Sequence, residues 1–518
     1  MARWSRRPWG EQLPSGIAAA DWIAHHARYT PWAEAAHDLA SQRRYTYAQL
    51  DERVRRAALW LRTAFRIERG DRVAVLSRND TDVFELQFAC RRLGAIFVPL
   101  NWRLAVPELD FICRDAAPNV LLYGAELSDT ARELSPAVVP AAANLANGLP
   151  SDYENGLAEA SGYLAVPPLD LDDIWTIMYT SGTSGRPKGA LITYRMCVFN
   201  ALHCAMLVGL TARSKNLVVL PTFHTGGLNV YANPTFHCGG TNVVMRNFEP
   251  AEFLRLLADK PLGLTHLMGV PTNFAMLAQE PGFAEADLSH LQCIGIGGSA
   301  APPALIEAYG KRRIRLRQGW GMTETGPVGL LLSGEMALKK AGSCGLPPLY
   351  VQLKICNSEG REVKRGETGE LLIKGPSVTP GYWKLPDADR QAFTADGWLR
   401  SGDAARQDDD GYYYIVDRWK DMFISGGENV YPVEIENVIS QLVGVLENAV
   451  VGVPHPKWGE VGRAFVVLKP DSDLDEAAIL GHCAQYLARY KVPSEVRFLD
   501  TLPHNATGKI AKLQLARD

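Results

Sequence analysis

IWTIMYTSGTSGRPKGA, residues 174–190, is the most informative stretch of this 518-residue sequence. Residues 174–179 form an apolar run that predicts a buried strand. This run is followed by hydroxylated residues and glycines, namely Thr180, Ser181, Gly182, Thr183, Ser184 and Gly185. Glycines let backbone N–H groups turn toward an anion, hydroxyl groups add donors, and Lys188 adds a positive charge. We therefore predict that this loop binds a polyphosphate.

Two other interpretations of the loop fit the sequence less well. A Walker A loop requires the pattern G-x-x-x-x-G-K-[ST], whereas here Pro187 precedes Lys188 and Gly189 follows it. A flexible Ser/Gly linker needs no ordered element on either side. In this sequence a buried strand precedes the loop, and a helix with one apolar face is predicted after it. The residues of that face are Met196, Phe199, Leu202 and Met206.

The composition is that of a large globular protein. About one domain per 150 residues predicts roughly three units, packed as one large lobe and something smaller. Hydrophobic residues make up 47% and charged residues 21%, which excludes disorder as the main state. The net charge of −3, without any run of like charges, argues against nucleic acid as a partner. Asp21 interrupts the N-terminal apolar stretch, so neither a signal peptide nor a membrane span is predicted.

The cysteines indicate the compartment. Nine cysteines are scattered along the chain and never form a C-x-x-C pair, which argues against a disulfide framework and against a zinc site. We therefore expect a cytoplasmic protein without integral membrane association. The oligomeric state is left open between a monomer and a homodimer.

Strand-like apolar runs alternate with helical patterns along most of the chain. The runs lie at residues 72–76, 95–100, 119–123, 174–179, 217–220, 241–245 and 292–296. Such alternation predicts an α/β fold with largely parallel sheets. After Gly342 the pattern changes, and strand-like runs follow one another with little helix between them, at residues 351–355, 369–373 and 412–416. We expect these runs to form an antiparallel or barrel-like piece that closes the large lobe.

A domain boundary is predicted where a short polar link, DRWKD (417–421), follows the last of these runs. About 100 residues remain after it, which is enough for one small α+β domain. We therefore expect a large domain of residues 1–417 and a small domain of residues 418–518, with a hinge near Lys420.

The phosphate loop resembles the signature loop of the adenylate-forming superfamily, which contains acyl-CoA synthetases, adenylation domains of peptide synthetases and luciferases. Further segments are similar to motifs of that family and follow in the same order, from about Tyr45 to Lys512. They are GWGMTE (319–324), SGD (401–403), DRWKD (417–421) and NATGK (505–509). The resemblance implies a large N-terminal domain of sheets and helices that carries a small, mobile C-terminal domain.

The resemblance also implies a two-step reaction that uses ATP, Mg²⁺ and coenzyme A. A carboxylate attacks the α-phosphate of ATP to give an acyl-adenylate and pyrophosphate, and a thiol then displaces AMP. The chain is therefore expected to be an ATP-dependent carboxylic acid:CoA ligase. Three alternatives stay open: transfer of the acyl group to a carrier protein, a catalytically silent acyl or nucleotide sensor, and an NAD-dependent oxidoreductase. The last rests on the pattern G-x-G-x-x-A at residues 295–300.

The resemblance assigns roles to residues near the nucleotide. Glu324 is the implied Mg²⁺ ligand, because a cation that bridges phosphate oxygens favours a carboxylate, and Thr323 is the implied donor to the α-phosphate. Trp320 is expected to stack on adenine. The other nucleotide contacts implied by these motifs come from Lys188, Gly298, Ser299, Ala300, Gly319, Gly321 and Met322.

Roles are also implied for residues nearer the C-terminus. Asp403 is expected to accept hydrogen bonds from both ribose hydroxyls, and Arg418 to reach the ribose as well. Lys509 is expected to neutralise charge on the α-phosphate and the acyl carboxylate during adenylation. Lys420 is the expected hinge residue. The glycines that would allow close approach of the pantetheine arm are Gly426 and Gly427.

The acid pocket is predicted from the same resemblance. His224 stands where relatives place an aromatic residue or a histidine, and it joins Lys509, Thr323 and Glu324 as a candidate catalytic residue. The pocket residues are His224, Gly227, Gly297, Gly321, Pro327 and Val328, and we expect the glycines to leave room for an acid larger than acetate. GMTETGPV (321–328) matches the pattern of 4-coumarate ligases and is also similar to fatty-acid ligases. We expect a hydrophobic acid, with an aromatic, hydroxycinnamic acid favoured over a fatty acid.

Overall fold

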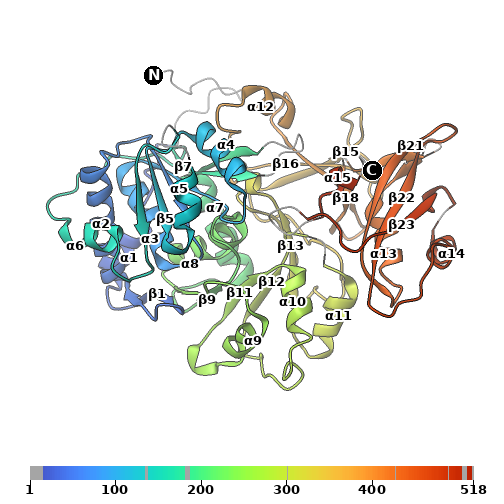
Figure 1. Cartoon of the computed structure of the whole chain (residues 1–518), viewed down its shortest axis with the longest axis horizontal. Coiled ribbons are helices and arrows are strands. Elements are labelled where there is room, and N and C mark those ends of the chain that lie inside the picture. The colour runs from blue at the N-terminus through green and yellow to red at the C-terminus, as the bar shows by residue number, and fades with distance from the viewer. Residues whose placement is uncertain are drawn as a thin grey trace. The chain divides into compact units, whose positions relative to one another are not determined.

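The computed structural model describes residues 16–134, 138–180, 187–299, 301–419, 421–425, 428–487, 489–504 and 510–515. Backbone contacts divide the chain into two compact units (Figure 1). The first unit comprises Met1–Leu353 and Ile373–Leu399, and the second comprises Lys354–Leu372 and Arg400–Asp518. Each unit is described by itself below.

The first unit contains a six-stranded sheet in which all neighbouring strands are parallel except the last pair. Its order is β6 (Ala142–Leu145), β5 (Val120–Gly124), β3 (Arg72–Leu76), β4 (Ile96–Pro99), β7 (Ile174–Thr180) and β8 (Lys188–Thr193). The antiparallel pair β7 and β8 encloses the predicted phosphate loop.

The second sheet of this unit has eight strands and is antiparallel only at its two edges. Its order is β14 (Val328–Leu331), β13 (Leu316–Gly321), β12 (Cys293–Ile296), β11 (His266–Gly269), β9 (Lys215–Val218), β10 (Thr241–Val244), β1 (Glu34–Asp38) and β2 (Arg44–Thr46). The predicted α/β fold with largely parallel sheets is therefore confirmed.

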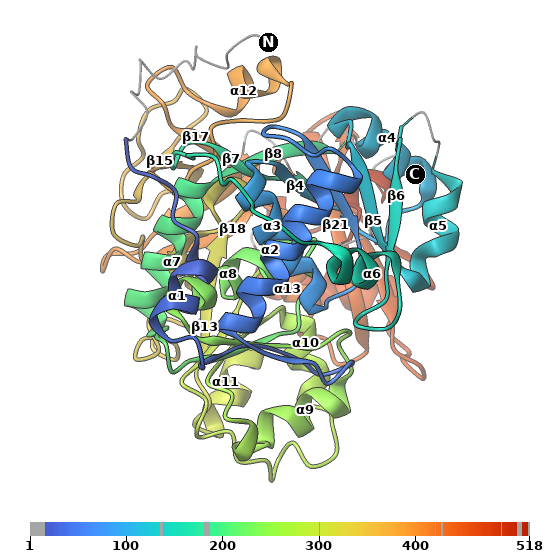
Figure 2. The ribbon, with the colours of Figure 1, turned by 90° about the vertical axis from the view of Figure 1, so that its left-hand side faces the viewer.

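Helices cover both faces of both sheets. A central layer packs between the sheets and consists of α1 (Trp22–Tyr29), α2 (Tyr47–Ala64), α3 (Thr81–Leu93), α6 (Asp152–Glu159), α7 (Tyr194–Val208) and α8 (Ala232–Cys238). The outer face of the six-stranded sheet carries α4 (Val106–Ala116) and α5 (Ser128–Glu133). The outer face of the eight-stranded sheet carries α9 (Pro250–Ala258), α10 (Pro271–Leu277) and α11 (Pro303–Lys311). Figure 2 shows α9, α10 and α11 on the far side of β13 from α2 and α3.

The sequence of β3 explains why both faces of its sheet are buried. Successive side chains of a strand point to opposite faces. Val73 and Val75 pack with the central helices, whereas Ala74 and Leu76 pack on the opposite side, with α4 among their neighbours. A parallel strand covered on both faces therefore shows an unbroken apolar run, which is the pattern that identified these strands in the sequence.

A strand that the sequence analysis did not predict lies between the phosphate loop and the helix predicted after it. Residues 188–193 first form β8, and α7 begins at Tyr194, where the Thr193 hydroxyl accepts a hydrogen bond from the Met196 N–H. The predicted apolar face of this helix is wrong, because Leu202 and Met206 are exposed. The buried face includes polar residues that find partners in the core, and its members are Met196, Cys197, Asn200, Ala201, His203, Cys204 and Val208.

In its described residues, the second unit combines two sheets with helices. The predicted barrel-like piece is a four-stranded sheet with the order β15 (Gln352–Cys356), β16 (Gly369–Lys374), β17 (Leu399–Gln407) and β18 (Tyr413–Arg418). The other sheet contains β20 (Glu428–Val430), β19 (Phe423–Ser425), β22 (Gly459–Leu468), β21 (Val445–His455) and β23 (Glu495–Phe498). Its helices are α13 (Pro432–Ile439), α14 (Glu476–Tyr486) and α15 (Lys512–Leu515). The boundary at residue 417 and the hinge near Lys420 stay predictions.

Two further features bear on the expectations from composition. All nine cysteines are free, in agreement with the absence of a disulfide framework. Among the residues that the structure describes, no helix is both long and apolar enough to cross a membrane.

Candidate active site

The predicted phosphate loop is fixed at both ends by one strand pair. Residues 181–186, which include Ser181, Gly182, Thr183, Ser184 and Gly185, lie outside the described residues. On either side of them, Thr180 of β7 pairs with Lys188 of β8. The Thr180 hydroxyl also donates a long hydrogen bond of 3.5 Å to the Lys188 carbonyl oxygen. The two strands therefore hold the ends of the loop at the edge of a packed sheet.

Residues 379–383, which precede α12 (Pro386–Ala392), connect this strand pair to the Thr-Glu motif. The Trp383 N–H donates to the Gly189 carbonyl oxygen at 2.7 Å. The Thr379 N–H donates to the Glu324 carbonyl oxygen at 2.8 Å. Backbone hydrogen bonds of this kind position groups more firmly than side-chain contacts, because they do not depend on rotamers. The strand pair that flanks the loop and the Thr-Glu motif are thus parts of one hydrogen-bonded framework.

The Glu324 carboxylate is buried within this framework. Glu324 is 5% exposed and lies in the short helical turn η4 (Thr323–Thr325). The Tyr382 hydroxyl donates to Glu324 Oε1 at 2.9 Å. Burial, together with the Glu324 carboxylate, raises the pKa of Tyr382 above its usual range, so the phenol keeps its proton and remains a donor. The Lys188 ammonium lies 5.4 Å from the centre of the Tyr382 ring. One tyrosine therefore contacts both the predicted metal ligand and the predicted phosphate-binding lysine.

The residues of this framework fit a Mg²⁺ ion that is held jointly with phosphate. Mg²⁺ is commonly bound by one or two carboxylates and completes its shell with phosphate oxygens and water. Glu324 supplies a carboxylate, and Thr323, equally buried, adds a hydroxyl group in the same turn. In the described ranges, no group of three or more His, Cys, Asp or Glu side chains could hold a metal ion without such help. The ion would supply positive charge to the phosphate oxygens, and Glu324 is the group that would hold it.

The ends of β12 and β13 bring further predicted residues to one edge of the eight-stranded sheet. Ile296 pairs with Gln318, so residues 297–299, which follow β12, start beside residues 319–321, which continue β13 and pair with β14. Gly298 has φ +82°, a left-handed conformation that glycine adopts without strain. Ala300 lies outside the described residues. These two segments, together with Met322 directly after the second, include the residues predicted to contact the nucleotide, namely Gly298, Ser299, Gly319, Trp320, Gly321 and Met322.

Trp320 is partly buried, and its side chain packs on an apolar cluster. The buried members of that cluster are Val351, Ile373, Phe393 and Leu399. The cluster fixes the position of the ring, because an aromatic side chain has few rotamers. Stacking of this ring on adenine stays a prediction.

The pocket glycines do not leave room in the way that we expected. A Cβ atom on Gly321 would lie 1.7 Å from the Pro327 carbonyl oxygen. A Cβ atom on Gly227 would lie 2.3 Å from the carbonyl oxygens of Leu220 and Pro221. These neighbours are backbone atoms, which cannot rotate away. Glycine is therefore required at both positions for close approach of the backbone, and the argument that these two glycines create space is wrong.

His224 is exposed, and its own turn orients its ring. The Gly226 N–H donates to His224 Nδ1 at 3.1 Å. Because Nδ1 accepts this hydrogen bond, the neutral imidazole carries its proton on Nε2.

A row of buried asparagines behind the predicted pocket was missed by the sequence analysis. The Val328 N–H donates to Asn200 Oδ1 at 3.4 Å, and Asn200 Nδ2 donates to the Asn229 carbonyl oxygen at 2.6 Å. Asn233 Nδ2 donates to Asn229 Oδ1 at 2.8 Å. Val328 of the predicted pocket is thus connected to α7 and α8 by hydrogen bonds of these asparagines, which the sequence analysis did not single out. Tyr382 was missed as well, and its signal was an aromatic residue in the turn-rich stretch GPSVTPGYW (375–383).

In the second unit, Asp403 lies on β17 and is 5% exposed. It pairs with Arg418 of β18, although the Arg418 side chain is outside the described part of the structure. The Asp403 N–H donates to Ser401 Oγ at 3.0 Å, and the Trp419 N–H donates to the Gly402 carbonyl oxygen at 2.8 Å. The SGD motif is thereby fixed against the segment that leads into the predicted hinge.

Four predicted residues, Lys420, Gly426, Gly427 and Lys509, lie outside the described residues. On either side of residues 505–509, His504 and Ile510 form a β-bridge. The Lys512 ammonium then pairs with a Glu436 carboxylate oxygen at 2.7 Å. Burial opposes this charge, but Glu436, together with Asp417 and Asp421, outweighs it and raises the pKa of Lys512. The residues on the two sides of 505–509 are therefore bridged to each other, and the segment that follows is tied to α13.

Two family models match this chain. One, described as AMP-binding enzyme, covers residues 23–383, and the other, described as AMP-binding enzyme C-terminal domain, covers residues 434–509. Among curated proteins, the chain is 39% identical to a feruloyl-CoA synthase of Amycolatopsis sp over 500 residues, which is 96% of this chain and 98% of that protein. It is also 37% identical to the long-chain-fatty-acid–CoA ligase FadD13 of Mycobacterium tuberculosis over 499 residues, 95% of this chain and 97% of the relative.

The chain is also similar to a solved structure of a coenzyme A synthetase. The o-succinylbenzoate coenzyme A synthetase MenE of Bacillus subtilis, in complex with ATP and a magnesium ion, matches with a TM-score of 0.86 and 30% identity. The match covers 96% of this chain and 99% of that one.

The fold and the site thus define an adenylate-forming enzyme, and the chain belongs to the AMP-binding enzyme family. Within that class it is an acyl-CoA synthetase, an AMP-forming acid–thiol ligase that depends on ATP and Mg²⁺ and uses coenzyme A as its second substrate.

Proposed function

We propose that this ligase activates an aromatic acid of the hydroxycinnamic type, such as ferulate, and transfers it to the thiol of coenzyme A. The observation that carries the proposal is the segment GMTETGPV (321–328), which matches the 4-coumarate ligase pattern. In the structure, Val328 of this segment packs on an apolar cluster around Tyr231 and Cys293, which suits an acid with a hydrophobic ring. The similarity to a feruloyl-CoA synthase supports the same choice.

A fatty acid is the second candidate substrate. The chain is nearly as similar to FadD13, whose name states that it acts on long-chain fatty acids, as it is to the feruloyl-CoA synthase. Both candidates share the adenylation chemistry and differ only in the shape of the pocket. The two proposals therefore separate in the range of acids that the enzyme accepts.

The roles that we propose for the site residues follow from their chemistry. In adenylation, an oxygen of the carboxylate forms a bond to the α-phosphorus, and pyrophosphate leaves with the electron pair of the broken P–O bond. Lys188 and the loop would hold the triphosphate, and Thr323 would donate to the α-phosphate. Tyr382 would orient Glu324 through the 2.9 Å hydrogen bond. Asp403 would accept hydrogen bonds from the ribose hydroxyls.

The second half-reaction breaks the acyl–phosphate bond. The thiolate sulfur of coenzyme A forms a bond to the acyl carbon, and AMP leaves as the anion. Gly426 and Gly427 are the proposed point of close approach for the pantetheine arm. Lys420 is the proposed hinge between the two half-reactions.

A release assay tests the proposed function. Purified enzyme is supplied with ATP, Mg²⁺, coenzyme A and one acid at a time, from coumarate, ferulate, benzoate, octanoate and palmitate, and pyrophosphate is measured. We expect the highest kcat/KM with coumarate or ferulate and AMP release that requires coenzyme A. Highest kcat/KM with palmitate would replace the aromatic proposal by the fatty-acid one. Adenylation without any release of AMP on addition of coenzyme A would favour a carrier protein as acceptor.

Replacing Lys420 by proline is expected to separate the half-reactions. Proline fixes φ and removes the backbone N–H, so a residue that must change its backbone angles can no longer do so. Pyrophosphate release in the first turnover should stay within about twofold of wild type, while thioester formation falls by at least about 10-fold. Rapid-quench measurement of both products checks this. A Lys420→Ala variant, which keeps backbone freedom, should retain both steps, and equal loss of both steps in the proline variant would contradict the hinge role.

A further inference from the structure

Two glycines lie one behind the other on the strand that leads to the predicted acid pocket. Residues two positions apart on a strand point to the same face, so Gly295 and Gly297 face the same side of β12. Met268 confirms this, because its Sδ would lie 2.8 Å from a Cβ on Gly295 and its Cε 3.0 Å from a Cβ on Gly297. Gly297 follows the carboxyl end of β12, and Gly295 lies about 6.6 Å deeper along the strand.

Tyr231 occupies the space in front of the deeper glycine. A Cβ atom on Gly295 would lie 2.7 Å from Tyr231 Oη, so glycine at this position is what lets the phenol reach the sheet. Tyr231 is 3% exposed and follows the π-helical turn η2 (Gly226–Val230) directly. Its hydroxyl has Cys293 Sγ at 3.6 Å, a weak contact. The ring is therefore held mainly by packing and not by a strong hydrogen bond.

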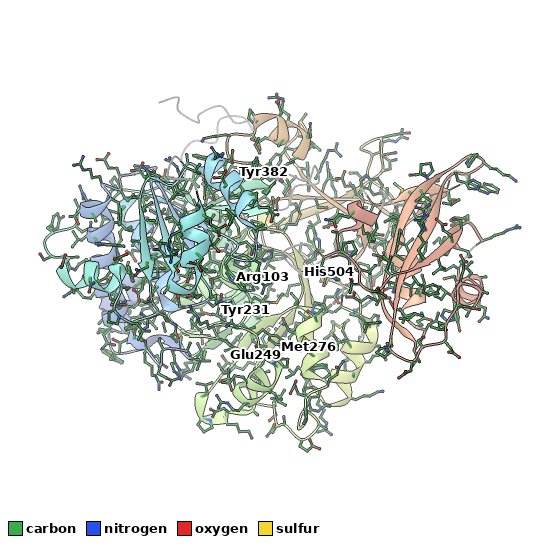
Figure 3. The ribbon with its side chains drawn as sticks, viewed as in Figure 1. Arg103, Tyr231, Glu249, Met276, Tyr382 and His504 are labelled. Atoms are coloured by element: carbon green, nitrogen blue, oxygen red, sulfur yellow. The ribbon has the colours of Figure 1, made fainter. Side chains whose placement is uncertain are left out.

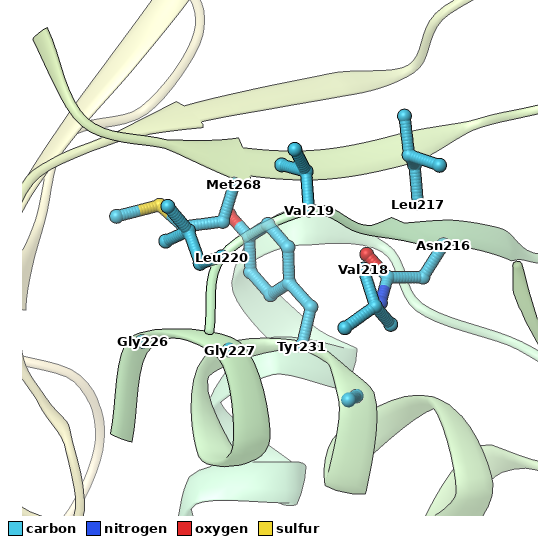
Figure 4. A pocket seen from close by; sticks show the side chains of 10 residues that line it. Asn216, Leu217, Val218, Val219, Leu220, Gly226, Gly227, Tyr231 and Met268 are labelled. Atoms are coloured by element: carbon cyan, nitrogen blue, oxygen red, sulfur yellow. The ribbon is translucent and has the colours of Figure 1, made fainter. Parts of the chain in front are cut away.

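The space beside the Tyr231 ring is almost completely filled, because only a small cavity remains there. The cavity has a volume of about 10 Å³, about the size that one water molecule needs. Figure 4 shows the Tyr231 ring between the helix that carries Gly226 and Gly227 and the strands above, next to Leu220 and Met268. Figure 3 places Tyr231 inside the first unit, away from its outline. An extended alkyl chain cannot pass this point while the ring stays in place.

We infer that Tyr231 closes the inner end of the acid pocket and limits the length of acid that the enzyme accepts. The inference rests on the proposed function, because it takes the acid to lie against Gly297 and Val328. Val328 packs on the same apolar cluster as Tyr231, so the pocket and the phenol are continuous. Met268 also borders this space, but a methionine side chain adapts to its neighbours, whereas a tyrosine ring is rigid. Tyr231 therefore admits an acid with one compact ring and excludes a long chain.

The test compares three substitutions at this position. Tyr231→Ala and Tyr231→Leu shorten the side chain, and Tyr231→Phe keeps the ring and removes only the hydroxyl. For each variant, kcat/KM is measured by pyrophosphate release with ferulate, octanoate and palmitate. The ratio of palmitate to ferulate should rise at least about 10-fold in the Ala and Leu variants and stay within about twofold of wild type in the Phe variant. An unchanged ratio in the Ala and Leu variants, or an equal rise in the Phe variant, would overturn the inference.

A substitution at Gly295, which faces Tyr231, keeps the inference testable if the variants with a shortened side chain at position 231 fail to fold. Gly295→Ala should push the phenol toward Gly297, because the new methyl group would meet the Tyr231 hydroxyl. The longest accepted acid should then become shorter, with octanoate losing more activity than benzoate. The double variant Gly295→Ala/Tyr231→Phe removes the contact with the hydroxyl, while the remaining contact with Met268 Sδ at 2.8 Å can relax because the methionine side chain is flexible. This variant should restore octanoate, whereas equal loss with both acids and no restoration would contradict the inference.

The two levels of the proposal fail in different ways. If wild-type enzyme releases no pyrophosphate with any of these acids, the proposed function fails. If wild type uses ferulate but folded Tyr231 variants keep its acid preference, only the role of Tyr231 fails. Wild-type turnover of palmitate equal to that of ferulate would contradict the length limit directly.

Discussion

Lys509→Ala is expected to slow acyl-adenylate formation by about 10² to 10³-fold, the effect of removing one preorganised group that stabilises developing charge. During adenylation, negative charge spreads over the α-phosphate and the acyl carboxylate, and the lysine ammonium is the proposed counter-charge. A full loss of the ammonium cannot be replaced by water, because water supplies no net charge. The measurement is single-turnover pyrophosphate release with saturating ATP, Mg²⁺ and acid.

The second half-reaction is the control for this prediction, because Lys509→Ala should leave it nearly unchanged. Thioester formation from chemically supplied acyl-adenylate needs no charge neutralisation by Lys509 and should stay within about threefold of wild type. Lys469→Ala removes an exposed lysine of the same unit and should leave both steps unchanged. Equal slowing of both half-reactions by Lys509→Ala, or of neither, would show that the role is assigned wrongly.

Glu324→Gln should lower adenylation by about 10² to 10³-fold and shift the Mg²⁺ dependence to higher concentration. The substitution keeps the shape of the side chain and keeps an oxygen that can accept the hydrogen bond from Tyr382. It removes the negative charge, and a hard cation binds a neutral amide oxygen more weakly than a carboxylate. The checks are a Mg²⁺ titration of pyrophosphate release and a thermal unfolding curve, which should change little.

Two further variants serve as comparisons for the loss of activity expected in Glu324→Gln. Tyr382→Phe leaves the charge of Glu324 but removes the donor at 2.9 Å, so we expect a smaller loss of about 10-fold, without the full shift in Mg²⁺ dependence. Glu335→Gln alters an exposed carboxylate and should have no effect. If Glu324→Gln slows the reaction with an unchanged Mg²⁺ titration, Glu324 acts on the phosphate site in some way other than by holding the metal.

The order of the large elements could be predicted because each strand has a local signature. The run at residues 72–76 coincides with β3, and the run at 241–245 extends one residue beyond β10. Buried parallel strands need apolar residues on both faces, so an unbroken apolar run in the sequence predicts such a strand. The strand β8 was not predicted because it is short and follows a loop whose sequence gives no sign of a strand pair.

The candidate site could be predicted only as far as its residues lie in continuous motifs. The loop after β7, the Thr323-Glu324 pair and Asp403 were predicted in this way, and their roles stay predictions. The pocket glycines were identified as residues but were interpreted wrongly, since the sequence does not show which atoms face a missing side chain. At Gly321 and Gly227 those atoms are carbonyl oxygens of the backbone.

By itself, the sequence determined that the chain carries a hydroxyl- and glycine-rich anion loop, a Thr-Glu pair and a Gly-Lys pair in the order of an adenylate-forming enzyme. Only the tertiary structure decided that Tyr382 donates to Glu324, 58 residues away, and that Tyr231 fills the space in front of Gly295. The physical reason is that a motif reflects backbone conformation over neighbouring residues. A contact between distant side chains depends instead on how sheets and helices pack, which no local pattern records.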